Sequence, residues 1–184
     1  IVVTGAGLPQ GQVWQEFEVY RPRTHITSGG FSTMGFTVPG AIGAKLAAPK
    51  APVLGIAGDG DFMQTMQEMA VVAQLDLPVL YIVLNNCGFR SIMNLQYNAF
   101  GYKRLIGVSF ERKDGSPYSA NFADCAKAFG LNARRIEDPE DVGPAVKKAL
   151  ASGRPSLVEI MTARKWPHTG VSKSGWWDVP IPTY

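Results

Sequence analysis

Carboxylate and amide side chains stand at two points of the chain where apolar runs end. Gly58-Asp59-Gly60 follows the apolar run 53–57, and Asn85-Asn86 follows the run 79–84. Of the 24 residues between the two motifs, those that precede the second run read as an amphipathic helical stretch. A strand, a helix and a second strand of this kind form a βαβ unit, which brings the carboxyl ends of both strands to one edge of a parallel sheet. We therefore expect Asp59 and Asn86 to meet at that edge.

Oxygen ligands of these types suit a hard divalent cation. Mg²⁺ prefers octahedral oxygen coordination and is usually held by one or two carboxylates together with substrate phosphates. Asp59 offers one negative charge, Asn86 a neutral amide oxygen, and Gly88 a backbone carbonyl where the chain turns. Gly58 and Gly60 lack a Cβ, which lets the backbone approach phosphate oxygens closely.

Two other interpretations of the motif are poorer. A turn Asp that caps a helix, with a separate Asn pair in a loop, does not explain both ends together. A haloacid-dehalogenase phosphatase also has a GDG turn, but an Asn-Asp pair follows it, whereas Asp61-Phe62-Met63 follow here. A helix predicted to begin near Phe62 directs its N-terminus at the same edge, which favours a phosphate group.

The GDG turn, the spacing and the Asn pair together resemble the motif of thiamine diphosphate (ThDP)-dependent enzymes. The resemblance implies ThDP and Mg²⁺ as cofactors. It implies that Asp59, Asn86 and the carbonyl of Gly88 bind the metal ion.

A second segment, residues 28–39, resembles the SGG-x-x-x-MG-x-x-x-P pattern of the acetolactate synthase branch. In that branch the Met wedges the cofactor into a bent shape, so Met34 is the predicted catalytic residue. A long, unbranched Met suits such an irregular gap, although an isolated Met would be interpreted as core. The resemblance also implies a hydrogen bond from the cofactor to the carbonyl of Ser32, where Gly is often found. The predicted cofactor contacts are Ser32, Met34, Gly58, Gly60, Asp61, Phe62 and Gly88.

The resemblance to acetolactate synthases implies C–C bond cleavage or ligation on 2-oxo acids by a lyase or transferase, with a carboligase as the leading interpretation. Three alternatives stay open: a C–C hydrolase of a cyclic diketone, which the ending 175–180 resembles, a subunit of a two-subunit 2-oxo acid decarboxylase, and a non-catalytic ThDP-binding module. Ile92 stands where pyruvate-type decarboxylases have a catalytic Glu, which argues against a simple aldehyde-releasing enzyme.

In the ThDP family, a Glu from a separate pyrimidine-binding domain activates the cofactor, normally from another subunit. No residue here is a good candidate: Glu16 and Glu18 lie between the first two strands, and Glu68 lies within a helix. We therefore expect the chain to supply only the diphosphate and Mg²⁺ half-site. A pyrimidine-binding domain or subunit would complete it in a homo- or hetero-oligomer.

Apolar runs and helical stretches alternate along the chain, which predicts an α/β fold with a doubly wound, mostly parallel sheet and helices on both faces. The predicted strands are 1–4, 25–27, 53–57, 79–84, 133–136 and 156–161. The predicted helices are 39–47, the stretch after the GDG turn, 91–96, 122–129 and 139–151. Residues 97–116 lack periodicity and are predicted to form a loop near the site. Residues 1–184 are expected to be one domain, with 162–184 as a C-terminal tail.

Composition agrees with this prediction. With 184 residues, 46% of them hydrophobic and 18% charged, the chain can form one sizeable core. The net charge of +3 is spread along the sequence, so we expect neither a nucleic-acid nor a membrane partner. Two cysteines make no disulfide framework. Because no apolar run reaches transmembrane length and no signal peptide is visible, a cytoplasmic location is predicted.

A few residues remain with open roles. Gly7 and Gln10, in the turn after the first strand, are candidate phosphate contacts, and a simple turn is an equal alternative. Neither histidine has partners at metal-ligand spacing, so His25 is predicted to be structural, and His168 could reach the mouth of the site. The Trp pair at 176–177 could close over the cofactor or pack on a neighbouring subunit.

Overall fold

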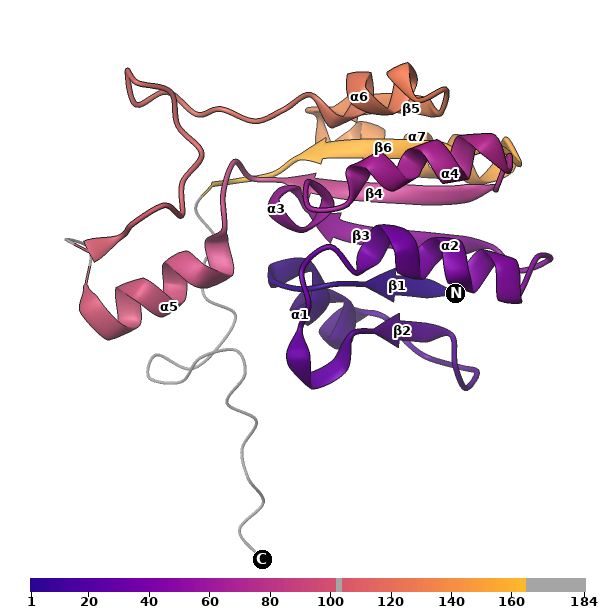
Figure 1. Cartoon of the computed structure of the whole chain (residues 1–184), viewed down its shortest axis with the longest axis horizontal. Coiled ribbons are helices and arrows are strands. Elements are labelled where there is room, and N and C mark those ends of the chain that lie inside the picture. Colours follow the sequence, from indigo (N-terminus) through magenta and orange to yellow (C-terminus); the bar gives the residue numbers. More distant parts are fainter. Residues whose placement is uncertain (102–103, 165–184) are drawn as a thin grey trace, which may run out of the picture.

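The computed structural model describes residues 1–101 and 104–164, which form a six-stranded parallel sheet with helices on both faces (Figure 1). The strands are β1 (Val2–Thr4), β2 (His25–Thr27), β3 (Val53–Gly58), β4 (Val79–Asn85), β5 (Asn132–Ile136) and β6 (Ser156–Met161). Their spatial order is β2-β1-β3-β4-β6-β5, and every neighbouring pair is parallel. The predicted doubly wound α/β fold is confirmed.

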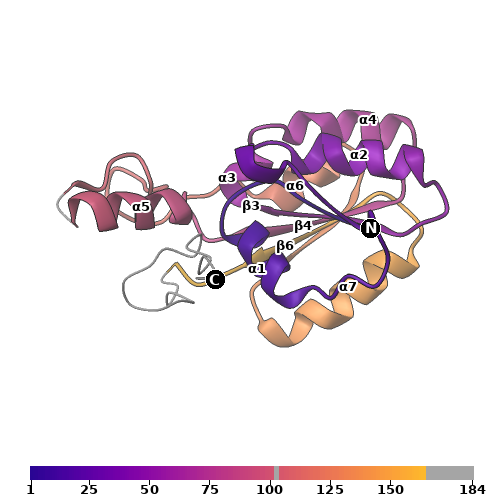
Figure 2. The ribbon, with the colours of Figure 1, turned by 90° about the horizontal axis from the view of Figure 1, so that it is seen from below.

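The helices lie in two layers. They are α1 (Leu8–Glu16), α2 (Thr37–Ala47), α3 (Asp59–Phe62), α4 (Met69–Gln74), α5 (Arg90–Phe100), α6 (Phe122–Ala128) and α7 (Val142–Ala151), with short 3-10 turns η1 (Gly29–Phe31), η2 (Met66–Glu68) and η4 (Pro139–Asp141). Figure 2 shows α2, α4 and α6 on one face of the sheet and α1 and α7 on the other. In the described part of the chain, no helix is long and apolar enough to cross a membrane.

The strand order reverses between β1 and β3. From β1 the chain passes through α1 to β2 on one side, and α2 then carries it back across to β3 on the other side. In open parallel sheets, ligands bind outside the carboxyl ends of the strands at such a reversal. The fold therefore places a binding site at the loops that follow β1 and β3.

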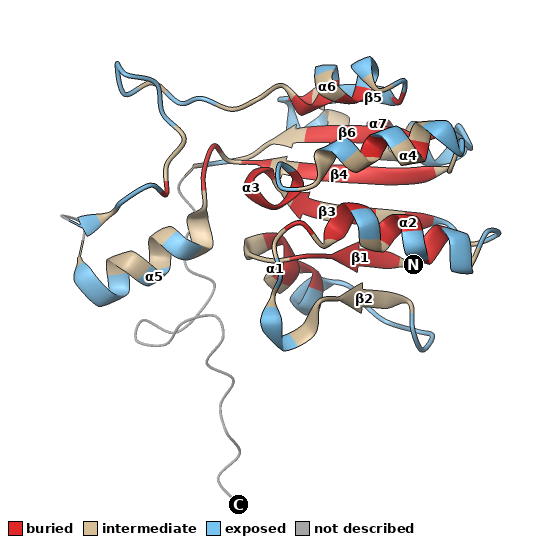
Figure 3. Cartoon of the chain, in the orientation of Figure 1, coloured by how far each residue is buried: buried red, intermediate tan, exposed pale blue. Residues whose placement is uncertain are grey.

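Strand β4 is buried on both faces, as its mostly red ribbon in Figure 3 shows, whereas buried and half-buried residues alternate along β3. Along β4, Tyr81 and Val83 pack in the larger apolar cluster beneath α2, α4 and α6, while Leu80 and Ile82 pack in the smaller cluster beneath α7. Strands covered on both sides read as continuous apolar runs rather than as alternating patterns. This explains why β3 and β4 could be recognised from the sequence.

The segment after the GDG turn differs from the single helix that we predicted near Phe62. Its first turn, α3, begins earlier, at Asp59, and the chain then tightens, with the amides of Gln64 and Thr65 bonded to carbonyls three residues back. Helix α4 follows only after η2. The predicted apolar positions nevertheless pack in or against the larger core cluster: Phe62, Met66, Met69 and Ala73.

Other differences concern helix lengths. Helix α1 was missed, although Pro9 stands in its first turn, because its apolar residues lack a regular helical period. Helix α5 extends to Phe100, so residues 97–100 are helical and not loop. The later part of that stretch returns to the site as predicted, since Ser109 bridges Gly88. The helix predicted from Pro139 begins as the 3-10 turn η4.

The aromatic centre of the core gives a stability prediction. The ring of Phe62 is fully buried and meets Tyr81 and Phe122 edge to face, at centroid distances of 5.8 and 5.6 Å. Phe62→Ala should lower the free energy of unfolding by about 3–5 kcal/mol, because it leaves a cavity among packed rings. Phe31→Ala is the matched control, since that ring is 95% exposed, and should change the value by less than about 0.5 kcal/mol. Urea unfolding measures both, and equal losses would contradict the core assignment.

Candidate functional site

A cavity of about 460 Å³ opens at the carboxyl edge of the sheet, where the strand order reverses. Its walls come from the loops after β1, β3 and β4, from the segment around η1, and from the first turns of α1 and α5. The lining residues are Ala6, Gly7, Leu8, Pro9, Gln10, Trp14, Gly29, Gly30, Ser32, Met34, Gly58, Asp59, Gly60, Asp61, Asn86, Gly88, Phe89, Arg90, Ser91, Ile92 and Leu95. The structure thus brings most of the predicted site residues to one place.

Asp59 joins the ends of β3 and β4. Its carboxylate is 2% exposed and accepts the amide of Gly60 on Oδ1 and the amide of Gly88 on Oδ2, both at 2.9 Å. Burial raises the pKa of this carboxyl, and the amides of Gly88, Gly60 and Cys87, together with the charge of Arg90, act against that rise. These three amides leave one of the four lone-pair sites of the carboxylate for a cation.

Three buried polar atoms on cavity-lining residues have no hydrogen-bond partner among residues 1–101 and 104–164. They are Asn86 Oδ1, Arg90 Nε and Ser91 Oγ. Buried polar atoms are nearly always paired in folded proteins, so such a cluster indicates a group that is supplied from outside the chain. An amide oxygen beside a carboxylate suits a hard cation. The residues present therefore fit a bound Mg²⁺.

The turn after β4 is held from both sides. Cys87 adopts a left-handed conformation with φ 57°, and its carbonyl accepts the amide of Phe110 at 2.9 Å. Gly88 pairs with Ser109, and its own carbonyl accepts the Arg90 amide at 3.1 Å, which leaves one lone pair free. A returning segment of the chain thus braces the turn that carries the predicted metal ligands.

The structure gives a different reason for glycine at position 60 from the close approach of a phosphate that the sequence suggested. A Cβ at this position would lie 2.3 Å from the ring of Phe89, which packs edge to face on Phe110. At Gly58, by contrast, a Cβ would meet Pro9 at an ordinary 3.6 Å. The second glycine of the motif therefore makes room for the Phe89 ring, which packs beside the turn after β4.

Asp61 turns its carboxylate toward the segment that carries Met34. Oδ1 accepts the amide of Gly35 at 2.5 Å, and Oδ2 accepts the hydroxyl of Thr37 at 2.6 Å. Burial raises the pKa of the Asp61 carboxyl, and the Thr37 hydroxyl and the amides of Gly35 and Ala6 oppose this. Asp61 lines the cavity, but both of its oxygens are occupied within the protein, so its observed contacts fix the conformation of the Met34 turn.

Ser32 and Gln10 support the same wall. Ser32 adopts a left-handed conformation, with φ 46° and ψ 52°, which explains why a glycine would be tolerated there. Its hydroxyl donates to Gln10 Oε1, and Gln10 Nε2 donates to the Thr27 hydroxyl, both at 2.7 Å. The side-chain amide of Gln10, 1% exposed, is thus bonded within the protein, whereas Gly7 lines the cavity.

Some predicted residues lie away from the cavity. The side chain of Phe62 lies in the core, so only its backbone is left for a cofactor contact. His25 bonds the Thr4 hydroxyl through Nε2 at 3.2 Å, and burial lowers its pKa, in keeping with a structural role. Burial and the charge of Asp59 raise the pKa of the Cys87 thiol, so the thiolate is disfavoured. His168, Trp176 and Trp177 lie outside the described residues.

Arg90 is the cavity residue that sequence reasoning missed most clearly. Its guanidinium donates to the carbonyl of Asn86 at 3.3 Å and lies close enough to Asp59 to interact with its charge. A basic residue directly after an Asn pair and a glycine turn, at the start of a helix, is the signal that could have identified it. Trp14 and Leu95 add apolar walls from α1 and α5.

These features define a class of protein, an α/β cofactor-binding domain with oxygen ligands at the reversal point of its sheet. The model of the thiamine pyrophosphate enzyme C-terminal TPP-binding domain matches residues 5–160, and the chain belongs to this family. The resemblance inferred from the GDG and Asn-Asn motifs is confirmed. ThDP is the cofactor of this type of domain.

Relatives include acetolactate synthases. The probable acetolactate synthase large subunit of Methanococcus aeolicus is 37% identical over 162 residues, which cover 87% of this chain and 26% of that protein. The mitochondrial acetolactate synthase of Schizosaccharomyces pombe is 35% identical over 164 residues, or 89% of this chain and 23% of that protein. The 3D-(3,5/4)-trihydroxycyclohexane-1,2-dione hydrolase of Lacticaseibacillus casei is 32% identical over 181 residues, which cover 98% of this chain and 28% of that protein. The chain spans about a quarter of the length of these relatives.

The bond between Thr37 and Asp61 can be tested directly. Thr37→Val keeps the shape of the side chain but leaves a buried carboxylate oxygen without its donor, so the free energy of unfolding should fall by about 1–3 kcal/mol. Thr37→Ser keeps the hydroxyl and should retain most of the stability. Chemical denaturation at neutral pH measures both variants. A Val variant as stable as the Ser variant would show that the bond does not hold the turn.

Proposed function

We propose that Asp59, Asn86 and the carbonyl of Gly88 bind Mg²⁺ and, through it, the diphosphate of ThDP. The single observation that carries this proposal is the unpartnered, buried Asn86 Oδ1, which lines the same cavity as the buried carboxylate of Asp59. One carboxylate and two neutral oxygens leave the remaining positions of an octahedral ion to phosphate oxygens and water. A cation would also offset the burial that raises the pKa of Asp59.

The negative charge of a diphosphate is proposed to be balanced by a positively charged side chain in addition to the metal ion. Arg90, with its unpartnered Nε on the cavity side of the turn, is suited to a phosphate oxygen, because a guanidinium carries several donors in a fixed plane. Ser91 offers a hydroxyl nearby, and the glycines at 58 and 60 border the same space. In this proposal Asp61 contacts the cofactor through its backbone, because its carboxylate is already bonded to Gly35 and Thr37.

Met34 is proposed to wedge the cofactor and Ser32 to bind its pyrimidine through the backbone carbonyl. Both residues line the cavity, as do Asn86 and Gly88 in the loop after β4. The Asp61 carboxylate and the Thr65 hydroxyl, which donates to the Gly35 carbonyl at 2.8 Å, hold the Met34–Gly35 turn. A wedge must be rigid to bend a ligand, and these bonds supply that rigidity.

The complete protein is proposed to cleave or form C–C bonds on 2-oxo acids, as an acetolactate synthase-like carboligase. When bound, ThDP supplies a nucleophilic ring carbon and an electron sink. The acetolactate synthases among the relatives support this function. Ile92, which lines the cavity, makes the substrate side apolar. A hydrolase of cyclic diketones is the second candidate, because the relative of that name matches 98% of this chain.

The chain is proposed to form half of the site. Among the described cavity-lining residues, the carboxylates are Asp59 and Asp61, and both have other partners, so the activating Glu would come from a pyrimidine-binding domain or a partner subunit. Exposed apolar side chains at the cavity mouth, including Trp14 and Leu95, fit such a covered face. Oligomeric assembly and a cytoplasmic location stay predictions.

Replacing the metal carboxylate tests the proposed function. Asp59→Asn keeps the size of the side chain but removes the one protein charge proposed for the cation. In the full-length protein it should abolish Mg²⁺-dependent ThDP binding, which isothermal titration calorimetry measures with and without Mg²⁺. Asp114→Asn, on an exposed turn, is the control and should bind as the unmodified protein does. Undiminished affinity in Asp59→Asn would refute the metal assignment.

The wedge makes a different prediction. Met34→Ala should lower kcat by more than it raises the dissociation constant of ThDP, because the diphosphate is held elsewhere, and this is the pattern of a lost transition-state interaction. Met34→Leu, which keeps a bulky apolar group, should retain more activity than the Ala variant. Steady-state kinetics on the full-length protein, together with cofactor titration, separate the two effects. A Met34→Ala variant with full kcat would make Met34 an ordinary apolar wall residue.

A further inference from the structure

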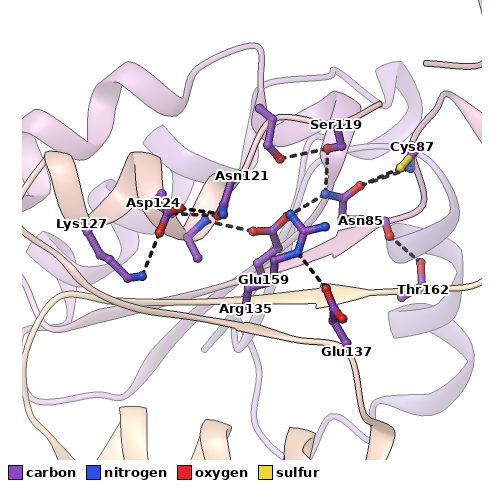
Figure 4. Close-up of polar contacts among 12 residues, drawn as sticks. Asn85, Cys87, Ser119, Asn121, Asp124, Lys127, Arg135, Glu137, Glu159 and Thr162 are labelled. Atoms are coloured by element: carbon purple, nitrogen blue, oxygen red, sulfur yellow. Dashed lines mark hydrogen bonds and ion pairs between the residues drawn. The ribbon is translucent and has the colours of Figure 1, made fainter. Parts of the chain in front are cut away.

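A buried polar cluster lies next to the proposed metal-binding turn, at the end of β4, and Figure 4 shows its contacts. Its centre is Glu159 on β6, at 0% exposure. Asn85, the last residue of β4, is equally buried and lies beside it. Burying a carboxylate costs free energy unless its oxygens are hydrogen-bonded, so its partners show which groups it holds in place.

The partners of Glu159 come from three different elements. Oε1 accepts Asn85 Nδ2 at 2.7 Å, and Oε2 accepts the amide of Ala123, in the first turn of α6, at 3.0 Å. Arg135 on β5 places Nη1 3.6 Å from Oε1. One side chain therefore connects the end of β4 to β5 and α6.

These contacts fix which way the Asn85 amide points. An ionised carboxylate can only accept hydrogen bonds, so the group that Asn85 turns toward Glu159 must be its NH₂. The second hydrogen of that group goes to the hydroxyl of Ser119 at 2.7 Å. Asn85 Oδ1 must then face the other way, where it accepts the amide of Cys87 at 3.2 Å.

The Cys87 amide belongs to the turn that carries the proposed metal ligands. Cys87 is left-handed, a conformation that is unfavourable for a residue with a Cβ, so the turn needs bonds that hold it. The bond from Cys87 to Asn85 lies on one side of the turn, and the bond from Gly88 to Asp59 lies on the other. Between them, the side chain of Asn86 lines the cavity.

We propose that Glu159 is a positioning residue for the metal site. By fixing the amide of Asn85, it holds Cys87 in its left-handed conformation and so keeps Asn86 Oδ1 and the Gly88 carbonyl on the cavity side. Residues behind metal ligands commonly change metal affinity about 10–100-fold when they are replaced. The inference rests on the proposed function, because it takes Asn86 and Gly88 as ligands.

Glu159→Gln is the sharpest single change. A Gln side chain presents one acceptor and one donor, so either the Ala123 amide or the Asn85 NH₂ meets a donor. If the Asn85 amide turns to relieve this clash, its NH₂ then faces the Cys87 amide, and the turn loses the bond between Cys87 and Asn85, keeping only its contacts with Asp59. We expect the Mg²⁺ dissociation constant of the full-length protein, measured by calorimetry at saturating ThDP, to rise about 10–100-fold. In the metal-free protein, hydrogen exchange at the Cys87 amide should become faster.

Two companion variants separate positioning from stability. Val158→Ala, on the same strand, weakens the smaller apolar cluster without touching the polar one, so its Mg²⁺ dissociation constant should stay within about threefold of the unmodified value. Glu159→Gln combined with Asn85→Asp restores the match, because the introduced amide accepts from Ala123 and donates to the introduced carboxylate, which in turn accepts from Cys87. This double variant should recover at least about tenfold in affinity over Glu159→Gln. Asn85→Asp alone should bind weakly, because two carboxylates then face each other, although it has the same carboxylate at position 85 as the double variant.

Each outcome decides between the possibilities. An unmodified protein that binds no Mg²⁺ with ThDP would refute the proposed function itself. If the unmodified protein binds Mg²⁺ and Glu159→Gln binds it equally well, or loses no more affinity than Val158→Ala, the positioning role is wrong and Glu159 only anchors α6. If Glu159→Gln alone does not fold, the double variant decides. A double variant that folds without recovered Mg²⁺ binding overturns the inference, and so does a double variant that fails to fold.

Discussion

The carboxylate of Asp59, buried between the ends of two adjacent strands, is the constraint around which the site is organised. It accepts amides from its own turn and from the turn after β4, so it ties two loops that are 29 residues apart in sequence. Two further buried carboxylates act in the same way. Asp61 holds the Met34 turn and Glu159 holds α6 and Asn85. In a parallel sheet, every strand ends at the same edge in a loop with free amides, and these three side chains bind amides at that edge.

The same burial that organises these carboxylates also disfavours their charged forms. Burial raises the pKa of both Asp59 and Asp61, and the amides that they accept only partly compensate. For Asp61, the hydroxyl of Thr37 and the amide of Gly35 act against the effect of burial. For Asp59, amides are joined by the charge of Arg90, a cavity-lining residue whose Nε has no partner in the described part of the chain. The two carboxylates thus differ in their surroundings, because Asp61 is bonded to a neighbouring side chain and Asp59 is bonded to backbone amides alone.

Much of the fold could be predicted because the central strands are long apolar runs and because glycine turns mark their ends. The cavity-lining positions of Asp59, Asn86, Gly88 and Met34 followed from motif spacing. What could not be predicted depends on contacts between distant segments. The reason for Gly60 lies in the ring of Phe89, and the helix after the GDG turn is broken where its chain folds onto the Met34 turn.

The contacts of Glu159 were also not predicted from the sequence, although its position in β6 offered an indication. A single charged residue within the apolar run of β6 is a strong indication of a buried partner, but the sequence does not say which one. Helix α1 was missed for the opposite reason. Its sequence, with glycine and few apolar residues, has little helical periodicity, and its position is set by contacts such as the bond of Gln10 to Thr27.

Helix α5 stands away from the sheet, as Figure 1 shows, and none of its residues is buried in this chain. Yet Ile92 and Leu95 on this helix form part of the cavity wall. Replacements on α5 therefore alter the shape of the ligand space while leaving the packed strands and the carboxylates at their ends untouched. Such a division separates residues that shape one wall of the cavity from residues that stabilise the fold, so sequence variation on the helix after the Asn pair should cost little stability.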